Sequence, residues 1–298
     1  MAFENSCIDL HMHTNASDGT DDAVTLLDNL EKAGIRTFAI TDHDTFDGAE
    51  KMKVLLKETK RDFLFFPGIE FSCVSDDGKC HILGYCCNTE HEAFQAAFRE
   101  GRERREKKLR QRLDFLKKNN IIIPEETRSR LFAMPSVGKP HLARLLMERG
   151  IANSIEDAIR VYINPCDTQT NRINAEMAIK AILASGGVPV WAHPLGGEGE
   201  KLISKDKFMR QFERLYAAGL KGLECCYSRY EKEERQFLTG AARERGLAIS
   251  GGSDYHGKNK NIPLGMLGAE GEKVGPEVLT IVPLLKDALA KLEKSAPI

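Results

Sequence analysis

Two histidines near the start of the chain are spaced to bind a metal ion. His11 and His13 fall within an apolar segment, residues 7–13, whose composition predicts a β-strand. Side chains two residues apart on a strand point to the same face, so both imidazoles can reach one ion. Asp9 shares that face, and we expect it to orient one imidazole from outside the metal's ligand set. Taken alone, the pair is also compatible with two unrelated polar residues at a strand end.

Four more histidines stand beside predicted strands, so six of the eight in the chain share this placement. His43 lies in Thr-Asp-His-Asp, His81 opens His-Ile-Leu-Gly, His193 lies in Ala-His-Pro, and His256 ends Ser-Asp-Tyr-His. Glu70 follows another strand, in Pro-Gly-Ile-Glu. Neutral imidazole and carboxylate suit first-row divalent ions, and a carboxylate can bridge two of them. We therefore predict a metal cluster with Glu70 as its bridge.

Short apolar segments alternate with helical patterns around these residues. The predicted strands are residues 7–13, 37–41, 63–69, 81–85, 188–192, 222–226 and 247–250. The clearest helical patterns cover residues 22–33, 176–185, 207–218 and 231–245. This alternation predicts a mainly parallel α/β sheet, either open or closed into a barrel. In a parallel barrel the carboxyl ends of the strands meet on one face, where the histidines would converge.

One long stretch breaks the alternation. Residues 90–173 have an almost wholly helical pattern and no convincing strand, and the strand–helix rhythm returns at residue 174. We predict that residues 1–89 and 174–298 form the barrel core that carries the metal site. Residues 90–173 are expected to form a helical insertion that caps one end of the barrel.

Composition restricts the classes of function. The formal net charge of the 298 residues is −1, which argues against a dedicated polyanion-binding domain. No apolar run reaches the length of a membrane span, and the first residues do not resemble a secretory signal. The eight cysteines include no Cys-x-x-Cys pair, which is typical of reduced, mostly buried thiols. We expect a cytoplasmic protein without a membrane partner. The oligomeric state stays open.

Taken together and in order, the motifs resemble those of the polymerase and histidinol phosphatase (PHP) family. They begin with Asp9-Leu-His-Met-His-Thr and Ser17-Asp18-Gly19 and end with Gly252-Ser-Asp-Tyr-His. The segment around residues 138–149 resembles the insertion of PHP phosphoesterases that act on small phosphorylated molecules and nucleotides. The resemblance implies a distorted (β/α)7 barrel with two or three divalent ions, which would be manganese, iron or zinc.

Carried over motif by motif, the resemblance assigns nine residues to three metals. The first metal would be held by His11, His13, Glu70 and Asp254, the second by Glu70, His81 and His193, and the third by Asp18, His43 and His256. Several family members carry histidine at the position of Asp18. An aspartate there favours a harder ion such as manganese.

Such a cluster could activate water for attack on a phosphate ester. Two ions bridged by a carboxylate can lower the pKa of a shared water enough to supply hydroxide near neutral pH. We predict that this hydroxide attacks phosphorus in line, while the ions neutralise the developing charge. His43 and His256 are expected on the leaving-group side. Asp42 and Asp44 are both candidates for proton transfer, and the sequence does not choose between them.

An anionic substrate also needs cations outside the metal cluster. Lys139 and His141 lie at a predicted helix start, Gly-Lys-Pro-His, where backbone N–H groups favour a phosphate. An ordinary solvent-facing helix start explains the same residues. Arg172 and Arg229 flank core strands near the predicted active-site end and could grip a second phosphate. Either arginine could instead be a surface ion-pair partner.

The substrate class has several interpretations. Residues 99–112 hold eight basic and three acidic residues. We interpret them as a solvated helix with Glu-to-Arg pairs rather than a nucleic-acid surface, since no interleaved aromatic residues for base stacking are evident. The favoured function is hydrolysis of small phosphate mono- or diesters, such as sugar phosphates, cyclic phosphates or nucleotide bisphosphates. The alternatives are an exonuclease that acts on RNA or DNA ends, a metal-dependent amidohydrolase, and a catalytically silent module.

Overall fold

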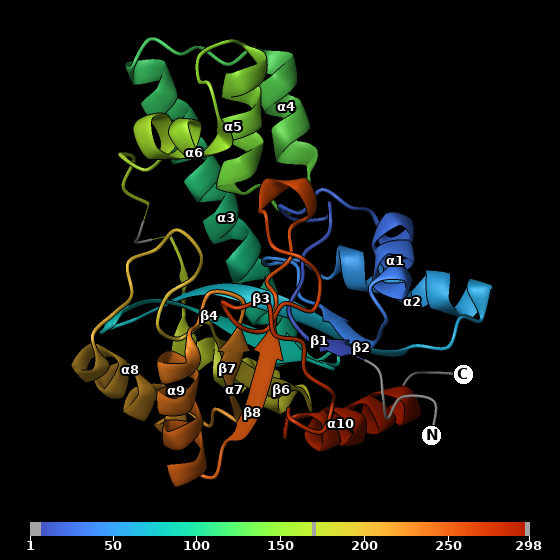
Figure 1. Ribbon diagram of the computed structural model, residues 1–298. Coiled ribbons are helices and arrows are strands. Elements are labelled where there is room, and N and C mark those ends of the chain that lie inside the picture. Colours follow the sequence, from blue (N-terminus) through green and yellow to red (C-terminus); the bar gives the residue numbers. More distant parts are fainter. Residues whose placement is uncertain (1–6, 169–170, 296–298) are drawn as a thin grey trace.

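A single sheet organises the chain. The computed structural model describes residues 7–168 and 171–295. Seven strands follow the order β1-β2-β3-β4-β6-β7-β8, and the short β5 pairs with β3 (Figure 1). Their bounds are β1 Cys7–Asp9, β2 Ile35–Ile40, β3 Leu64–Ser75, β4 Gly78–Tyr85, β5 Ile173–Asn174, β6 Val188–Ala192, β7 Gly222–Tyr227 and β8 Ala248–Gly252.

The two ends of this sheet meet, so the sheet is a nearly closed barrel. The Leu10 N–H donates to the carbonyl of Gly251 at 3.2 Å, and the Asp254 N–H donates to the carbonyl of His11 at 2.8 Å. The close approach requires glycine at position 252, because a Cβ there would lie 2.3 Å from the Cβ of His11. The predicted α/β barrel is confirmed.

Strand β4 departs from the expected parallel order. It runs antiparallel to both β3 and β6, whereas the β1–β2, β2–β3, β6–β7 and β7–β8 pairs are parallel. The cause is local: Ser75 pairs with Gly78, so only Asp76 and Asp77 connect the two strands. A connection this short can join only antiparallel neighbours.

Two strands also differ from the prediction in length. β1 ends at Asp9, because the residues that follow bond to the segment after β8 instead of continuing the ladder with β2. β3 continues to Ser75, well past the predicted end at residue 69, since its second half pairs with β4. Glu70 is therefore in the middle of a strand and not at its end.

Helices cover the outside of the barrel. They are α1 Ala23–Lys32, α2 Asp47–Thr59, α7 Ala175–Ala184, α8 Lys205–Ala217, α9 Lys232–Glu244 and α10 Val282–Ser295. Each of α1, α7 and α8 begins after a residue whose side chain accepts from the third residue beyond it, namely Asp22, Asn174 and Ser204. One large apolar cluster fills the barrel and the space beneath these helices.

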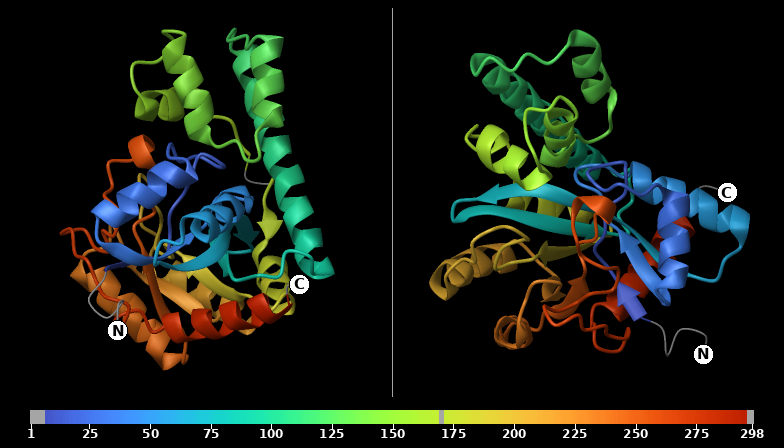
Figure 2. Two further views of the ribbon diagram at one scale, coloured as in Figure 1. Left: turned by 90° about the vertical axis from the view of Figure 1, so that its right-hand side faces the viewer. Right: turned by 45° about the horizontal axis from the view of Figure 1, so that its top comes forward.

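The remaining helices rise from one end of the barrel. They are α3 Glu92–Lys118, α4 Glu125–Ala133, α5 Lys139–Glu148, the short α6 Ile155–Asp157, and a π-helical turn at Ala158–Ile163. α3 runs along one side of the barrel and carries the others above the face toward which β8 points (Figures 1 and 2). A second apolar cluster, built around Leu113, Leu131, Leu142 and Leu146, lies wholly within residues 90–173. The domain boundaries themselves stay a prediction.

Two further expectations concern the whole chain. All eight cysteines are free, and six of them are buried, which agrees with the reduced thiols predicted from their spacing. Within the described ranges, none of the helices combines the length and the apolar character needed to cross a membrane.

Candidate metal centre

Glu70 is the hub of a buried cluster of imidazoles. Its carboxylate is 1% exposed and lies at the middle of β3. One oxygen, Oε2, faces three ring nitrogens, and the other, Oε1, faces two. The Oε2 distances are 3.4 Å to His11, 3.2 Å to His13 and 2.9 Å to His43, and the Oε1 distances are 2.8 Å to His81 and 3.1 Å to His193.

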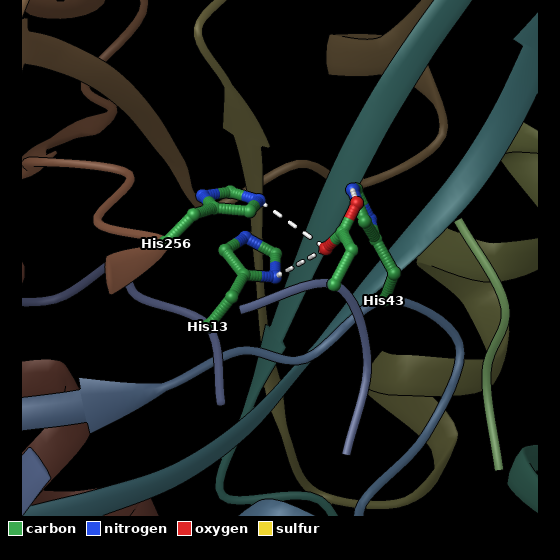
Figure 3. Close-up of side chains that lie close together, drawn as sticks. His13, His43 and His256 are labelled. Carbon is green, nitrogen blue, oxygen red and sulfur yellow. Dashed lines mark ion pairs between the residues drawn. The ribbon is translucent and has the colours of Figure 1, made fainter. Parts of the chain in front are cut away.

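Asp18 forms a second centre next to the first. Oδ1 lies 3.2 Å from Nε2 of His256 and 3.8 Å from Nδ1 of His13, and Oδ2 lies 3.9 Å from Nε2 of His43. The three imidazoles converge on this one carboxylate from different parts of the chain (Figure 3). His13 and His43 each present their other ring nitrogen to Glu70, so the two centres share ligand residues.

Asp254 is a third carboxylate of the cluster and faces His11 and His13. Its Oδ1 lies 3.3 Å from Nε2 of His13 and 3.6 Å from Nε2 of His11. Its Oδ2 accepts hydrogen bonds from the Tyr227 hydroxyl at 2.9 Å and from the Lys260 ammonium at 2.6 Å. One oxygen of Asp254 is thus directed at the cluster while the other is fixed by the protein.

The backbone brings these residues together in three ways. His11 and His13 follow β1 in an extended segment that pairs with residues after β8. His81 reaches the same face from the amino-terminal half of β4, because that strand is antiparallel. His193 and Asp254 have positive φ angles of 29° and 59° just after β6 and β8. Such conformations are uncommon outside glycine and concentrate at functional sites.

The electrostatics of the metal-free cluster favour ionised carboxylates and shift the imidazoles in both directions. Burial would raise the pKa values of Glu70, Asp18 and Asp254, but the surrounding imidazoles, with Lys260 at Asp254, hold all three well below the ordinary range. Burial lowers the pKa of His81 to about 3, and burial together with Lys260 lowers the pKa of His256 to about 4. Burial also acts to lower the pKa values of His11, His13 and His193, but the neighbouring carboxylates raise them above the usual value, that of His13 to about 9. Carboxylates and imidazoles bind metal in their deprotonated forms, so a bound metal would displace protons from these three rings.

The donor atoms fit a bound divalent ion. Five buried atoms of the cluster have no hydrogen-bond partner: Nε2 of His11, Nε2 of His13, Nδ1 of His43, Oδ1 of Asp18 and Oε2 of Glu70. Buried polar atoms are almost always hydrogen-bonded, so five orphans in one place indicate a missing partner. Three overlapping groups of these side chains have their donor atoms close enough to hold an ion. Imidazole and carboxylate together suit manganese, iron or zinc.

The structure brings all nine predicted metal ligands into this one cluster. The division of the ligands among three metals stays a prediction. Two contacts cut across that division, since His13 also faces Asp18 and His43 also faces Glu70. Both residues thus lie between two of the predicted positions.

Neither acidic neighbour of His43 presents a free oxygen to the cluster. The Asp42 carboxylate accepts from the N–H and hydroxyl of Thr14, at 2.8 and 2.7 Å, and from the hydroxyl of Ser17 at 2.5 Å. The Asp44 carboxylate accepts from the Ser72 N–H and from the Arg105 guanidinium, at 2.9 and 2.8 Å. Both aspartates therefore brace the loops around the site, and their role in proton transfer stays an untested prediction.

The four predicted phosphate-binding residues have different surroundings. Arg172 lies at the cluster, with Nη1 3.2 Å from Nε2 of His81. Lys139 and His141 lie in the first turn of α5, where His141 accepts the Gly138 N–H and the Lys139 ammonium donates to Asn164. A Cβ at Gly138 would lie 2.7 Å from Oδ2 of Asp18, so this helix start adjoins the metal centre. Arg229 instead donates to backbone carbonyls of Gly197 and Glu200.

The basic stretch of α3 is not fully solvated, and this part of the sequence interpretation was wrong. Glu-to-Arg pairs do line its outer side, at Glu100–Arg104 and Glu106–Arg110. However, Arg105, Lys108 and Arg112 are only 6–8% exposed. They are spaced three and four residues apart, as positions on one helix face are, but exposed charged residues of α3 have the same spacing, so the sequence does not distinguish the two sets.

Glu224 was also missed, and Asp9 contacts the backbone of a ligand histidine instead of its ring. The Asp9 carboxylate accepts from the backbone N–H groups of His11, at 3.3 Å, Ser253 and Gly265 and from the Ser253 hydroxyl. The carboxylate that touches the ring of His11 is Glu224, on β7. A single acidic residue inside the apolar run Gly-Leu-Glu-Cys-Cys-Tyr was the available signal.

Comparisons with known proteins point to one family. The PHP domain model matches residues 9–162. The 5′-3′ exoribonuclease Rnm of Escherichia coli is 30% identical over 251 residues, which cover 83% of this chain and 84% of that protein. The 3′,5′-nucleoside bisphosphate phosphatase of Chromobacterium violaceum is 26% identical over 253 residues, which cover 84% of this chain and 87% of that protein.

A solved structure agrees with the fold over the whole chain. A candidate metal-dependent phosphoesterase from Bifidobacterium adolescentis matches with a TM-score of 0.79 and 25% identity, covering 97% of both chains. The match therefore includes the helices of residues 90–173 as well as the barrel.

Proposed function

The chain belongs to the PHP domain family, and on this premise we propose that it is a metal-dependent phosphoesterase of small phosphate mono- and diesters. One observation carries the proposal: a buried carboxylate, Glu70, is surrounded by five imidazoles, and its Oε2 and the nitrogens of His11, His13 and His43 that face it have no hydrogen-bond partner. Two or three ions held there lower the pKa of water and offset negative charge on a phosphoryl group. We infer manganese, iron or zinc from the ligand types.

The chain's own residues prepare this site for hydrolysis. The carbonyl of Asp254 lies 2.8 Å from Nδ1 of His256 and can only accept a hydrogen bond, so Nδ1 carries the proton and Nε2 faces Asp18 as a lone pair. Tyr227 and Lys260 fix Asp254 so that one oxygen is directed inward. Such fixed donors reduce the reorganisation needed when charge develops on the substrate.

Buried cations beside the cluster favour a substrate with a second anionic group. Burial and the neighbouring Arg105 and Arg172 lower the pKa of Lys108 well below its usual value, and burial lowers the pKa of Arg112 to about 10. Nε of Arg112 has no hydrogen-bond partner. The Asp44 carboxylate, whose charge acts on Lys108, already pairs with Arg105. A phosphate between Lys108, Arg112 and Arg172 would compensate this charge.

A substrate panel tests the proposal. The metal-loaded protein would be assayed with p-nitrophenyl phosphate, bis(p-nitrophenyl) phosphate, a 3′,5′-nucleoside bisphosphate, a cyclic sugar phosphate and a sugar monophosphate. We expect release of phosphate or alcohol, with the highest kcat/KM for a bisphosphate. The turnover should be lost in Glu70→Ala and retained in Glu50→Ala, a matched change on the exposed side of α2. Absence of turnover on every ester, with metal bound, would refute the proposal.

An exoribonuclease is the second candidate. The relative from E. coli that is 30% identical has this activity, and α3 carries arginines next to aromatic rings. The Arg102 guanidinium lies 5.9 Å from the ring centre of Phe98, and that of Arg110 lies 4.7 Å from that of Phe132. Aromatic rings beside arginines can stack on bases. Stepwise shortening of a 3′-labelled oligoribonucleotide would support this activity, and an intact oligonucleotide beside rapid bisphosphate hydrolysis would exclude it.

A further inference from the structure

Glu224 contacts two histidines of the metal cluster at atoms other than the ring nitrogens that face Glu70. It lies on β7, and its side chain is fully buried. Oε1 lies 2.9 Å from Nδ1 of His11, and Oε2 accepts the backbone N–H of His193 at 2.6 Å. We propose that Glu224 is a positioning residue that fixes the tautomer of His11 and the backbone of His193, and so sets the affinity of the cluster for its metals. The inference rests on the proposed metal-dependent function.

The contact with His11 determines which nitrogen is available to a metal. An ionised carboxylate can only accept a hydrogen bond, so the proton shared with His11 must be on Nδ1. In the neutral ring, which is the form that binds metal, Nε2 then carries a lone pair, and it lies 3.4 Å from Oε2 of Glu70 and 3.6 Å from Oδ1 of Asp254. This nitrogen has no hydrogen-bond partner. A carboxylate behind a ligand histidine both selects this tautomer and makes the ring a stronger ligand.

The contact with His193 acts on the backbone. His193 has a φ of 29°, which a non-glycine residue rarely adopts without support. Its N–H is held by Glu224, and its Nε2 is consequently placed 3.1 Å from Oε1 of Glu70. The rings of His11 and His193 are stacked with their centres 5.7 Å apart. One carboxylate therefore fixes residues that face the two different oxygens of Glu70.

The charge of Glu224 also couples it to the cluster. Within residues 7–168 and 171–295, its only ion-pair partner is His11, and no lysine or arginine comes within ion-pair distance. A buried carboxylate without a cation is costly. A metal bound by His11 would place positive charge on the far side of the ring that Glu224 contacts.

Glutamine at this position keeps the size of the side chain and breaks one of the two contacts. If the amide NH2 group faces His11, the ring must accept at Nδ1 and carry its proton on Nε2, which blocks the ligand atom. If the NH2 group faces His193, it meets the backbone N–H donor and the positive φ loses its support. Either orientation weakens metal binding. Cys225→Ser is the matched control, because Cys225 is the next residue on β7 and equally buried, and its thiol donates to the backbone carbonyl of Leu223 instead of to the cluster.

The test measures metal affinity and the tautomer of His11, and neither needs turnover. Titration of the metal-free protein with Mn²⁺ should show a dissociation constant about 10- to 100-fold higher in Glu224→Gln than in wild type. The control should change it by less than about 3-fold at unchanged circular dichroism. In wild type without metal, two-dimensional ¹H–¹⁵N correlation of the imidazoles should show His11 protonated on Nδ1.

The outcomes separate this inference from the proposed function. Wild-type Mn²⁺ affinity in Glu224→Gln, or an equal loss in the Cys225→Ser control, would overturn the inference. If Glu224→Gln does not fold, a wild-type His11 that carries its proton on Nε2 alone would overturn it equally. A selective loss of affinity in a protein that hydrolyses no phosphate ester would uphold the role of Glu224 while the proposed function fails.

Discussion

Replacement of Arg105 by methionine tests how the helices of residues 90–173 support the barrel. Arg105 extends from α3 to the loop after β2, where its guanidinium contacts the Asp44 carboxylate at 2.7 Å and the Ser72 hydroxyl at 2.8 Å. Its side chain is 10% exposed and that of Asp44 is 1% exposed. Methionine keeps much of the volume but leaves Asp44 buried without its cation.

The expected cost follows from this burial. Removal of one partner from a buried ion pair typically lowers the free energy of unfolding by about 3–5 kcal/mol. Arg104→Met is the matched control on the same helix, because Arg104 pairs with Glu100 while 37% and 34% of their side chains are exposed. Exposed pairs of this kind contribute less than about 1 kcal/mol. Adding Asp44→Asn to Arg105→Met should recover part of the loss, since the unpaired charge is removed.

Urea denaturation of the metal-free proteins, followed by circular dichroism, measures these differences. We expect Arg105→Met to unfold at a clearly lower urea concentration than Arg104→Met. We also expect a lower kcat, because Asp44 directly follows His43. If Arg105→Met and Arg104→Met differ by less than about 1 kcal/mol, the contact between α3 and Asp44 does not brace the site and the reasoning is refuted.

Four further outcomes are expected. Glu70→Gln should abolish turnover and lower the bound metal content, as measured by elemental analysis, because its carboxylate is the hub of the cluster; a fully loaded, active variant would contradict this. Lys108→Met and Arg112→Met should each raise KM for a bisphosphate by roughly 10- to 100-fold, the equivalent of a charge-assisted hydrogen bond, and leave p-nitrophenyl phosphate unaffected. Burial, with nearby Arg112 and Lys79, lowers the pKa of Lys139 to about 8. Lys139 is therefore charged below that pH. The KM for a bisphosphate should rise as pH increases through about 8, and this dependence of KM on pH should be weaker in Lys139→Met. Chelation should lower Tm in calorimetry, since ligand at 1,000 times its Kd stabilises by about 4 kcal/mol; an unchanged Tm would count against a structural role for the metals.

The sequence was most informative where chemistry required particular residue types. All nine predicted ligands lie in one cluster, because an ion can be held only by side chains with suitable donor atoms at strand ends or loops that converge. The strand–helix rhythm predicted an α/β sheet, either open or closed, and the family resemblance predicted the barrel. It could not predict the direction of β4, which depends on the two-residue connection at Asp76 and Asp77.

Residues that act through contacts distant in sequence were not predictable in the same way. Asp9 and Glu224 are both acidic residues in apolar strands, and nothing in the local pattern says which one reaches His11. Which carboxylate reaches the ring of His11 depends on how β1 and β7 lie in the closed barrel. His11 and Glu224 are 213 residues apart in the sequence. Arg105 and Lys108 looked like solvated positions because the charge pattern of α3 does not show which face lies against the barrel.

The metal content of the purified protein tests the central claim most directly. The protein would be stripped with a chelator, reloaded with Mn²⁺, dialysed and measured by elemental analysis, with Glu70→Ala prepared in parallel. We predict two or three bound ions per chain in the wild type, fewer in the variant, and phosphate-ester hydrolysis only in the loaded wild type. A wild-type protein that retains no metal and yet folds normally would contradict the account.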